Sequence, residues 1–581
     1  MTKMTTSGSP SQPPVPVRGR GIAWKRLLLI GVLFGVAIAA ATQNVLNDQG
    51  MSNTFAFFCG AVGLLLASIM SLRALARRTS TAIALGVGLV LVMLPISLFR
   101  LRGFSGAMMP IVESRFKSSS TLKETIVPSE LADAVVTAES AFPQFLGPDR
   151  NAVITERIFD IPSPSGKEPN WRINIGEGWG GFSILGEHCV TLEQRGADEC
   201  VSAYHLGTGE LIWISKTPAR HENIAGGIGP RSTPTIVDDM VYTQGATGIV
   251  KCLRLASGEV VWRQDLLALG GWTQTESEAA ISWGRAASPL LVDGLCIVPF
   301  GRNRGASPDS DLLAGRSLIA LDAASGEVRW TGGDDQISYA SAMKMTFDGV
   351  DQVVSVNEST ISGHGLADGK TLWSAAWEGQ SNGGANCASA LAIGTTDFLA
   401  AKGYGVGSAR FTVAKNEESN GWDVTEVWSN HRILKTKFTH ACIDGEIAYA
   451  LSDETLECID LRDGSRLWPK SRAAQFGHGH VIQVGDVLIV QTESGDVTFV
   501  AADPVQFKIL ATIDALSSKT WNIPAIAGSF LLCRNDAEAV LYRLNAYPDF
   551  PTTPAPTEPP PRPEATPSTA SAKINRPAPL D

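Results

Sequence analysis

The sequence lacks most of the short motifs that mark a catalytic or metal centre. It has no C-x-x-C motif, no C-x-x-C-H haem attachment site and no His/Cys cluster with zinc spacing. It also has no phosphate-binding loop and no nucleophile–base pair recognisable by spacing. These absences count against zinc, haem and thiol redox chemistry, and they make a binding role the first hypothesis.

Positive charge is in short supply. The 581 residues include 48 Lys and Arg against 58 Asp and Glu, which gives a formal net charge of −10. A nucleic-acid-binding protein needs a basic surface to neutralise phosphates. The charge balance therefore argues against a nucleic-acid partner.

Charge is absent altogether from three apolar stretches near the N-terminus, at about residues 27–46, 54–72 and 81–99. Each approaches the roughly 20 residues that a helix needs to span a bilayer. We therefore predict three transmembrane helices. A cleaved signal peptide is not expected, because two more stretches follow the first.

The flanking basic residues predict the orientation of these helices. Seven lie before the first stretch or between the second and third: Arg18, Arg20, Lys25, Arg26, Arg73, Arg77 and Arg78. The loop between the first and second stretches has none, and only Arg100 and Arg102 oppose the pattern. The positive-inside rule thus predicts a multi-pass protein of a bacterial inner membrane, with everything after the third stretch in the periplasm.

A cassette of Gly and Trp four residues apart recurs along the chain. The copies are Gly209–Trp213, Gly258–Trp262, Gly326–Trp330, Gly369–Trp373 and Gly464–Trp468. Each lies between two short apolar runs, so we read it as a strand, a tight turn with Gly at positive φ, and a second strand that carries the Trp. A fixed cassette at a period near fifty residues indicates a repeat protein.

A second repeat, built on a small polar residue before an alternating apolar run, precedes each hairpin. Its positions are Ser183, Thr233, Ser288, Ser341, Ser389, Thr439, Gly479 and Ile523. Eight units of four strands predict an all-β, eight-bladed β-propeller after the membrane helices. Seven blades with one irregular insertion is the alternative.

Two further Trp residues extend the cassette series. Trp428 fills a gap in it, and Trp171 precedes the first full unit, whereas the last unit has no Trp hairpin of its own. The segment around Trp171 could therefore supply the missing outer strand and close the ring from both chain ends. We expect all seven Trp residues to pack between blades rather than contact a ligand; they are Trp171, Trp213, Trp262, Trp330, Trp373, Trp428 and Trp468.

Nine cysteines are present, and Cys59 lies in the second apolar stretch. The other eight are an even number, which permits disulfides outside the cytoplasm. Cys252 and Cys458, however, both lie ten residues before their Trp, where other units carry Ala or Gly. We therefore expect mostly buried free thiols.

The remaining segments divide the chain by composition. We predict a disordered cytoplasmic N-terminus at 1–23, a three-helix anchor at 24–100, a linker at 101–141, the propeller at 142–546 and a Pro-rich disordered tail at 547–581. A short helix near 129–140 would fit the linker.

Residues 142–545 resemble the propeller family with quinoprotein-type (pyrroloquinoline quinone) repeats. The matching pieces are Leu318–Trp330 and Leu456–Trp468, and Phe142–Asn151 looks like the opening segment common in planctomycete members. The family holds both enzymes and non-catalytic scaffolds, so the resemblance speaks for the fold more than for an activity.

The enzyme branch implies quinone-dependent alcohol or sugar dehydrogenases, with a calcium ion, an Asp base and often a disulfide between adjacent Cys residues. This sequence has no Cys-Cys pair, and no calcium ligand set is assignable to the channel mouth. Quinone with Ca²⁺ is therefore not supported by motifs. The non-catalytic branch resembles the propeller lipoprotein of outer-membrane β-barrel assembly, although Cys59 does not lie in a lipoprotein signal.

Function is expected at the mouth of the central channel, where the innermost strands of all blades begin. Two residues before the small polar positions stand Gly181, Arg231, Ala286, Tyr339, Cys387, Lys437, Gly477 and Trp521, and beside them Arg285, Asn386, His478, His480 and Asn522. Such a mouth would attract an anion. Alternatively, these side chains hydrogen-bond to interblade carbonyls and hold the ring together.

Two weaker candidates remain. His478 and His480 share one face of a strand, and His440 would complete a set of three for a metal. The loop 301–315 is the largest insertion and could carry partner contacts, or it could be a solvated excursion.

The sequence thus favours a membrane-tethered periplasmic propeller that binds an envelope protein or another anionic ligand without catalysis and requires no cofactor. The alternative is a quinone-dependent membrane oxidoreductase. Of the mouth residues, we expect Arg231, Arg285, Tyr339, Asn386, Lys437, His478, Trp521 and Asn522 to contact the ligand.

Overall fold

The structure is a computed structural model. It describes residue 69, residue 73 and residues 98–114, 116, 135–162, 168–223, 225–301 and 316–545. No helix within these ranges has the length and apolar character needed to cross a membrane. Nearly all of the three predicted spans, the two chain ends and the loop 302–315 lie outside the described residues.

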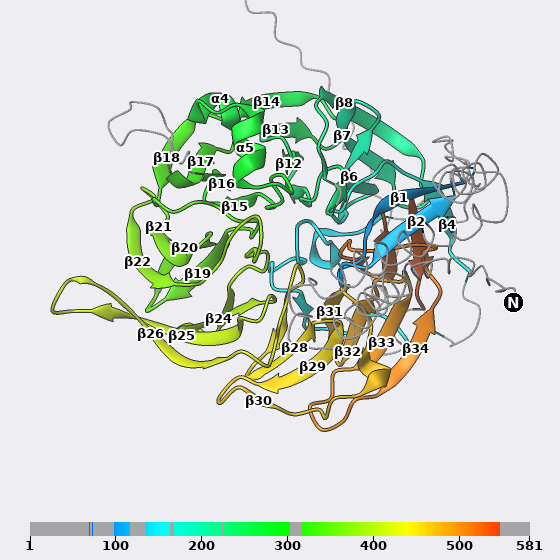
Figure 1. Cartoon of the computed structure of the whole chain (residues 1–581). Helices are drawn as coiled ribbons and strands as arrows, with labels where there is room; N and C mark the ends of the chain where they lie inside the picture. Colours follow the sequence, from blue (N-terminus) through cyan, green and yellow to red (C-terminus); the bar gives the residue numbers. More distant parts are fainter. Residues whose placement is uncertain are drawn as a thin grey trace, which may run out of the picture.

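Eight four-stranded antiparallel sheets form a closed ring, as predicted (Figure 1). Blades 1 to 4 comprise β5 (Ser183–Leu185), β6 (His188–Arg195), β7 (Asp198–His205) and β8 (Leu211–Pro218); β11 (Thr235–Val237), β12 (Met240–Gln244), β13 (Ile249–Arg254) and β14 (Val260–Asp265); β15 (Leu290–Val292), β16 (Leu295–Gly301), β17 (Arg316–Asp322) and β18 (Val328–Gly332); and β19 (Met343–Phe347), β20 (Val350–Val356), β21 (Thr360–Gly365) and β22 (Thr371–Ala376).

Blades 5 to 8 complete the ring. They comprise β23 (Leu391–Ile393), β24 (Asp397–Lys402), β25 (Gly407–Asn416) and β26 (Gly421–Asn430); β27 (Cys442–Asp444), β28 (Ile447–Ser452), β29 (Thr455–Asp460) and β30 (Ser465–Arg466); β31 (His480–Val484), β32 (Val487–Gln491), β33 (Val497–Ala501) and β34 (Ile509–Ile513); and β35 (Ala525–Ala527), β36 (Phe530–Arg534), β37 (Glu538–Arg543) and β4 (Trp171–Asn174).

Short elements decorate this ring. They are β1 (Phe99–Phe104), β2 (Pro110–Ser114), η2 (Ala138–Ser140), β3 (Val153–Ile154), β9 (Glu222–Asn223), β10 (Gly227–Ile228), α4 (Leu266–Gly270), α5 (Gln274–Ala280) and η3 (Arg472–Ala474). β3 pairs in parallel with β31 and adds a fifth strand to blade 7.

The last blade is closed by the first strand of the ring, as the Trp171 segment predicted. β4 pairs with β37 in an antiparallel register that sets Trp171 opposite Leu541 and Asn174 opposite Glu538. The two chain ends therefore share one sheet, and the ring has no open blade edge.

Each cassette Trp binds the blade that follows its own. Its indole N–H donates to a carbonyl at the turn between the third and fourth strands of the next blade. The pairs are Trp171 with Leu206 (2.8 Å), Trp213 with Leu255 (2.7 Å), Trp262 with Ala323 (2.8 Å), Trp330 with Leu366 (3.0 Å), Trp428 with Leu461 (2.7 Å) and Trp468 with Asp503 (2.8 Å).

The cassette Gly is the other half of this contact. Gly326 has φ 76°, and a Cβ placed on it would lie 2.7 Å from the Trp262 ring. Gly258 repeats the arrangement with φ 70° against Trp213. Gly is therefore required at this turn for its backbone conformation and because the neighbouring blade's indole covers it.

Trp373 is the exception. The next blade has no cassette Gly, because its β25–β26 hairpin has ten-residue strands instead. Trp373 donates to Gln352 Oε1 of its own blade at 2.7 Å and stacks on Phe398 of the next blade, with ring centroids 5.5 Å apart.

The small polar repeat forms a hydrogen-bonded belt around the channel. Three members accept a hydrogen bond from the preceding blade: Gly181 N donates to Thr233 Oγ1, Thr233 N to Ser288 Oγ and Ser288 N to Ser341 Oγ, all at 2.9 Å. A small hydroxyl is needed because the first strands approach one another closely at the axis. This belt fixes where the first strand of each blade begins.

The eight described cysteines are free, and all except Cys387 are buried, as predicted. Cys252 is directly opposite Trp262 in the sheet register. Its burial beneath the interblade indole explains why a small residue is needed there.

Two N-terminal segments occupy the channel. Residues 142–152 lie inside it, where Phe142 bridges Ile184 and the Arg150 guanidinium donates to Ser288 O at 2.7 Å (cyan, Figure 1). The β1–β2 hairpin lies at the channel end where the first strands begin, which we call the mouth face. This hairpin falls mostly where the sequence predicted a linker, but its first two residues, Phe99 and Arg100, belong to the predicted membrane anchor at 24–100 and form a strand instead.

Candidate functional site

A chamber of about 520 Å³ lies between these two segments, with Phe145 and the hairpin residues Ser105, Gly106 and Met108 among its lining. Seven of the eight positions two residues before the small polar repeat line it: Gly181, Arg231, Ala286, Tyr339, Cys387, Lys437 and Trp521. The eighth, Gly477, lines a neighbouring hollow beside the hairpin. The repeat register therefore leads directly to this chamber.

The chamber wall is largely aromatic. Trp283 lies against Tyr339 with ring centroids 5.1 Å apart, and Trp521 lies 5.0 Å from Trp179 and 5.1 Å from Phe438. Sequence reasoning missed Trp179, Trp283, Tyr404 and Phe438. The first three lie outside the repeat positions, whereas Phe438 stands between the chamber position Lys437 and the small polar position Thr439. Trp179 had a signal, since it stands two residues before Gly181 and alternation returns it to the same side.

Arg231 is the main charged group of the chamber. Its guanidinium donates to Gly229 O at 3.0 Å and to Gly226 O at 2.7 Å, and no described carboxylate pairs with it. Burial lowers the pKa of Arg231 to about 10. Here carbonyl dipoles replace water around the cation without neutralising its charge. The guanidinium therefore still attracts an anion.

Lys437 connects the chamber to the hairpin. Its ammonium donates to Gly106 O at 3.2 Å, and the ring of His478 is 3.5 Å away. His478 does not line the chamber, because it lies directly beneath Gly106 of the hairpin. Burial lowers the pKa of His478 well below its usual range, and the neighbouring Lys437 lowers it further.

Three predicted ligand contacts point away from the chamber and donate to backbone carbonyls instead. Arg285 donates to Phe300 O at 2.7 Å, Asn386 to Asn357 O at 2.8 Å and Asn522 to Gly180 O at 2.8 Å. Each is the chain neighbour of a chamber residue. Asn386 and Asn522 link neighbouring blades, as the alternative interpretation expected, whereas Arg285 bonds within its own blade.

The histidines of the predicted metal set are already engaged. Ser389 N donates to His440 Nε2 at 2.9 Å, and His480 Nε2 donates to Trp521 O at 2.9 Å. Burial lowers the pKa of His440 to about 3 and that of His480 to about 4. In the described part of the chain, no group of three or more His, Cys, Asp or Glu side chains could hold a metal ion.

A calcium-bound quinone does not fit this chamber. Among the described residues that line it, none is Asp or Glu, whereas Arg231 and Lys437 both carry positive charge. Calcium is held by six to eight oxygen ligands, usually including carboxylates, and two cations in the wall oppose it. We therefore derive no reaction step through such a group.

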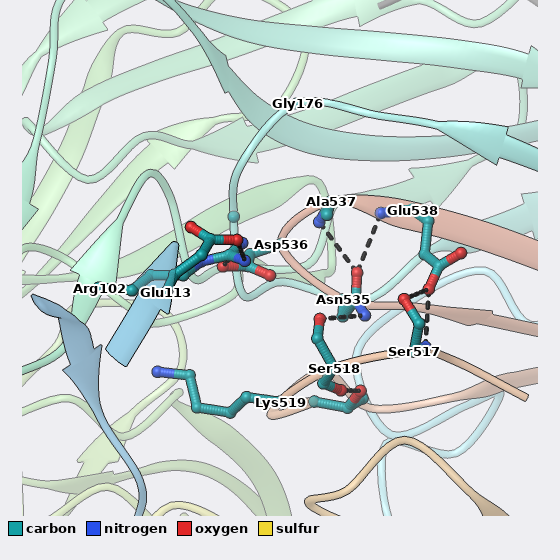
Figure 2. A network of polar contacts seen from close by, with 12 residues as sticks. Arg102, Glu113, Gly176, Ser517, Ser518, Lys519, Asn535, Asp536, Ala537 and Glu538 are labelled. Atoms are coloured by element: carbon teal, nitrogen blue, oxygen red, sulfur yellow. Dashed lines mark hydrogen bonds and ion pairs between the residues drawn. The ribbon is translucent and has the colours of Figure 1, made fainter. Parts of the chain in front are cut away.

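The hairpin is fixed over the chamber by polar contacts. Arg102 pairs with Asp536 at 2.8 Å and with Glu113 of its own hairpin at 3.3 Å (Figure 2). Gly106 N donates to Glu493 Oε1 at 2.6 Å, and Lys519 Nζ donates to Phe104 O at 3.1 Å. No hairpin residue belongs to the described hydrophobic clusters of the ring.

Comparison with known proteins supports the β-propeller fold. Residues 197–470 match the family model described as outer membrane protein assembly factor BamB. No curated protein matches the chain.

Several solved structures are similar. BamB from Moraxella catarrhalis matches with a TM-score of 0.43 and 13% identity over 65% of this chain and 100% of its own. A quinohemoprotein alcohol dehydrogenase from Comamonas testosteroni matches with a TM-score of 0.37 and 11% identity over 74% of this chain and 84% of its own. Neither a ligand nor a partner follows from likenesses at this identity.

The fold and the repeats define a β-propeller with quinoprotein-type repeats. Within that class, the chain resembles the outer-membrane assembly factor BamB over residues 197–470.

Proposed function

We propose that this chain is a membrane-tethered, non-catalytic binding module outside the cytoplasm, and that its propeller binds an anionic envelope ligand in the central chamber. The three uncharged apolar stretches support the tether. The resemblance to an assembly factor supports a binding role.

Arg231 is the observation that carries the proposal. Its partly buried guanidinium lines a cavity of about 520 Å³ whose described lining has no carboxylate. A volume of this size suits a small molecule or the end of a larger one. An acidic group on an apolar or aromatic body would satisfy both Arg231 and the aromatic wall.

Two fluorescent probes of nearly equal shape test this proposal. Anilinonaphthalene sulfonate is an aromatic monoanion, and phenylnaphthylamine has the same ring system without the sulfonate. We expect Arg231→Gln to weaken sulfonate binding by about tenfold or more, because a hydrogen bond to a charged group contributes about 1.5–3 kcal/mol. Binding of the neutral probe should stay nearly the same and shows that the variant is folded.

Arg254→Gln is the matched control. Arg254 is a half-exposed arginine that pairs with Glu259 at 3.4 Å at the hairpin turn between β13 and β14, away from the chamber. This variant should leave both affinities unchanged. An equal loss for both probes in Arg231→Gln, or no loss for either, would contradict a charge-selective chamber.

A further inference from the structure

The β1–β2 hairpin follows the third apolar stretch without a spacer. That stretch covers residues 81–99, and β1 begins at Phe99. A strand advances about 3.3 Å per residue, so the six residues of β1 reach at most about 20 Å from the end of the stretch. If residues 81–99 cross a bilayer, the hairpin must lie at its surface.

The two faces of the hairpin differ in polarity. Arg102 and Glu113 face the propeller and Asp536 (Figure 2). Val112 is adjacent to Glu113 in β2 and so points the opposite way, with 57% of its surface exposed. Met109 at the hairpin turn is 52% exposed, and Phe116 just after β2 is 77% exposed.

The contacts of the hairpin show which end of the propeller it covers. Its turn contacts Lys437 and Glu493, which belong to the mouth face. The described chain ends at the far face, where Asp160 N donates to Asn545 O at 2.8 Å. A membrane stretch that leads into the hairpin therefore approaches from the mouth side, and the chain leaves the ring on the opposite side.

We infer that the outer side of the β1–β2 hairpin, which carries Val112 and is flanked by the exposed side chains of Met109 and Phe116, rests on the lipid bilayer and turns the chamber mouth toward the membrane. This inference rests on the membrane tether of the proposed function. Its partner is the lipid surface, which suits apolar side chains beside the end of a membrane span. A ligand of the chamber would then arrive from the membrane side.

The full chain in vesicles of phosphatidylcholine and phosphatidylglycerol tests this orientation. An environment-sensitive fluorophore is attached at Val112→Cys, and quenching is measured with lipids brominated near the headgroup end of their acyl chains. The matched control is Val505→Cys, since Val505 is 84% exposed in the β33–β34 turn of the far face. The signal of the unsubstituted chain, which contains Cys387 and Cys59, is subtracted.

We expect quenching at position 112 to be several-fold stronger than at position 505. Equal quenching at the two positions, or stronger quenching at 505, overturns the orientation. A label at 112 that is shielded from water but not quenched by lipid would identify a second protein surface as the occupant and also overturns it. If the full chain does not float with the vesicles, both the membrane tether and this orientation are wrong. The charge selectivity of the chamber is tested separately, by probe binding to the Arg231→Gln variant.

Discussion

At the scale of single residues, the contact between a cassette Gly and the preceding Trp is the unit that joins blades. Gly326 meets the Trp262 ring, and the same ring donates to Ala323 O. A Trp buries a large apolar surface and needs a partner for its N–H. The turn supplies both because Gly leaves room for the ring and exposes a carbonyl beside it.

Gly326→Ala should therefore destabilise the protein more than Gly294→Ala. Both residues have φ near 75°, so each substitution carries a backbone cost of about 1–2 kcal/mol. Only at Gly326 does the new Cβ meet an indole, at 2.7 Å, whereas nothing lies within 4 Å of the position at Gly294. Overpacking should add about 1–3 kcal/mol.

The thermal unfolding midpoints of the two variants measure this difference. Because backbone strain is matched, the gap between them reports the interblade contact alone. Equal midpoints would mean that the Trp262 ring moves aside without cost.

Residue-level reasoning found chamber residues where a repeat position fixed the direction of a side chain. Arg231, Tyr339, Lys437 and Trp521 line the chamber. Arg285, the residue beside a chamber position, instead donates to Phe300 O of its own blade.

At the scale of elements, the β1–β2 hairpin lies over the chamber, and three of its residues line it. A two-stranded hairpin is marginal by itself. This one is held to the ring by the Arg102–Asp536 pair and by hydrogen bonds from Gly106 and Lys519. Few interactions must break for it to move, and its displacement would expose the chamber lining.

Cys387 reports this opening, because it is the one described cysteine that is not fully buried and it lines the chamber. Arg102→Ala removes a partly exposed ion pair worth up to about 1 kcal/mol, so modification of Cys387 by the neutral disulfide dithiodipyridine should become up to about fivefold faster. Mass spectrometry identifies the modified thiol, and Cys387→Ser gives the background.

The same reaction has a predicted pH dependence. Burial raises the pKa of the Cys387 thiol to about 12. Only the thiolate reacts, so the rate should rise about tenfold per pH unit across neutral and mildly alkaline pH.

Arg254→Ala is the matched control for Arg102→Ala, because it also removes a partly exposed ion pair but lies away from the mouth. An unchanged rate in Arg102→Ala would show that the hairpin does not limit access.

At the scale of the whole molecule, stability depends on closing the ring. β4 comes from before the first full blade, and it completes blade 8 beside β37. Trp171 is 2% exposed and joins this blade to blade 1 through Leu206 O. Each blade has two neighbours only while this junction holds.

Trp171→Ala should lower the stability of the chain by about 3–5 kcal/mol, because it empties a buried site and leaves Leu206 O without its indole donor. The thermal unfolding midpoint of the full chain measures the loss. Trp422→Ala is the matched control: Trp422 is a half-buried Trp of β26 that makes a cation–π contact with Lys415 and, unlike Trp171, has no part in closing the ring. Comparable losses in the two variants would contradict a special role for the closing strand.

The sequence by itself determined the class of fold and the strand that closes the ring, and it favoured eight blades over seven. These are properties of a local repeat, and a Gly four residues before a Trp has the same structural consequence in every unit. It also determined which positions converge at the axis, since strand alternation and the repeat register are local as well.

Only the tertiary structure decided what these positions do. It directed Asn386 and Asn522 to carbonyls of neighbouring blades and Arg285 to a carbonyl of its own blade, engaged His440 with Ser389 N, and brought the Trp179 and Trp283 rings into the wall. It also placed the β1–β2 hairpin over the mouth through contacts between residues more than 300 positions apart. No local pattern encodes such contacts, because they exist only once eight blades have closed around one axis.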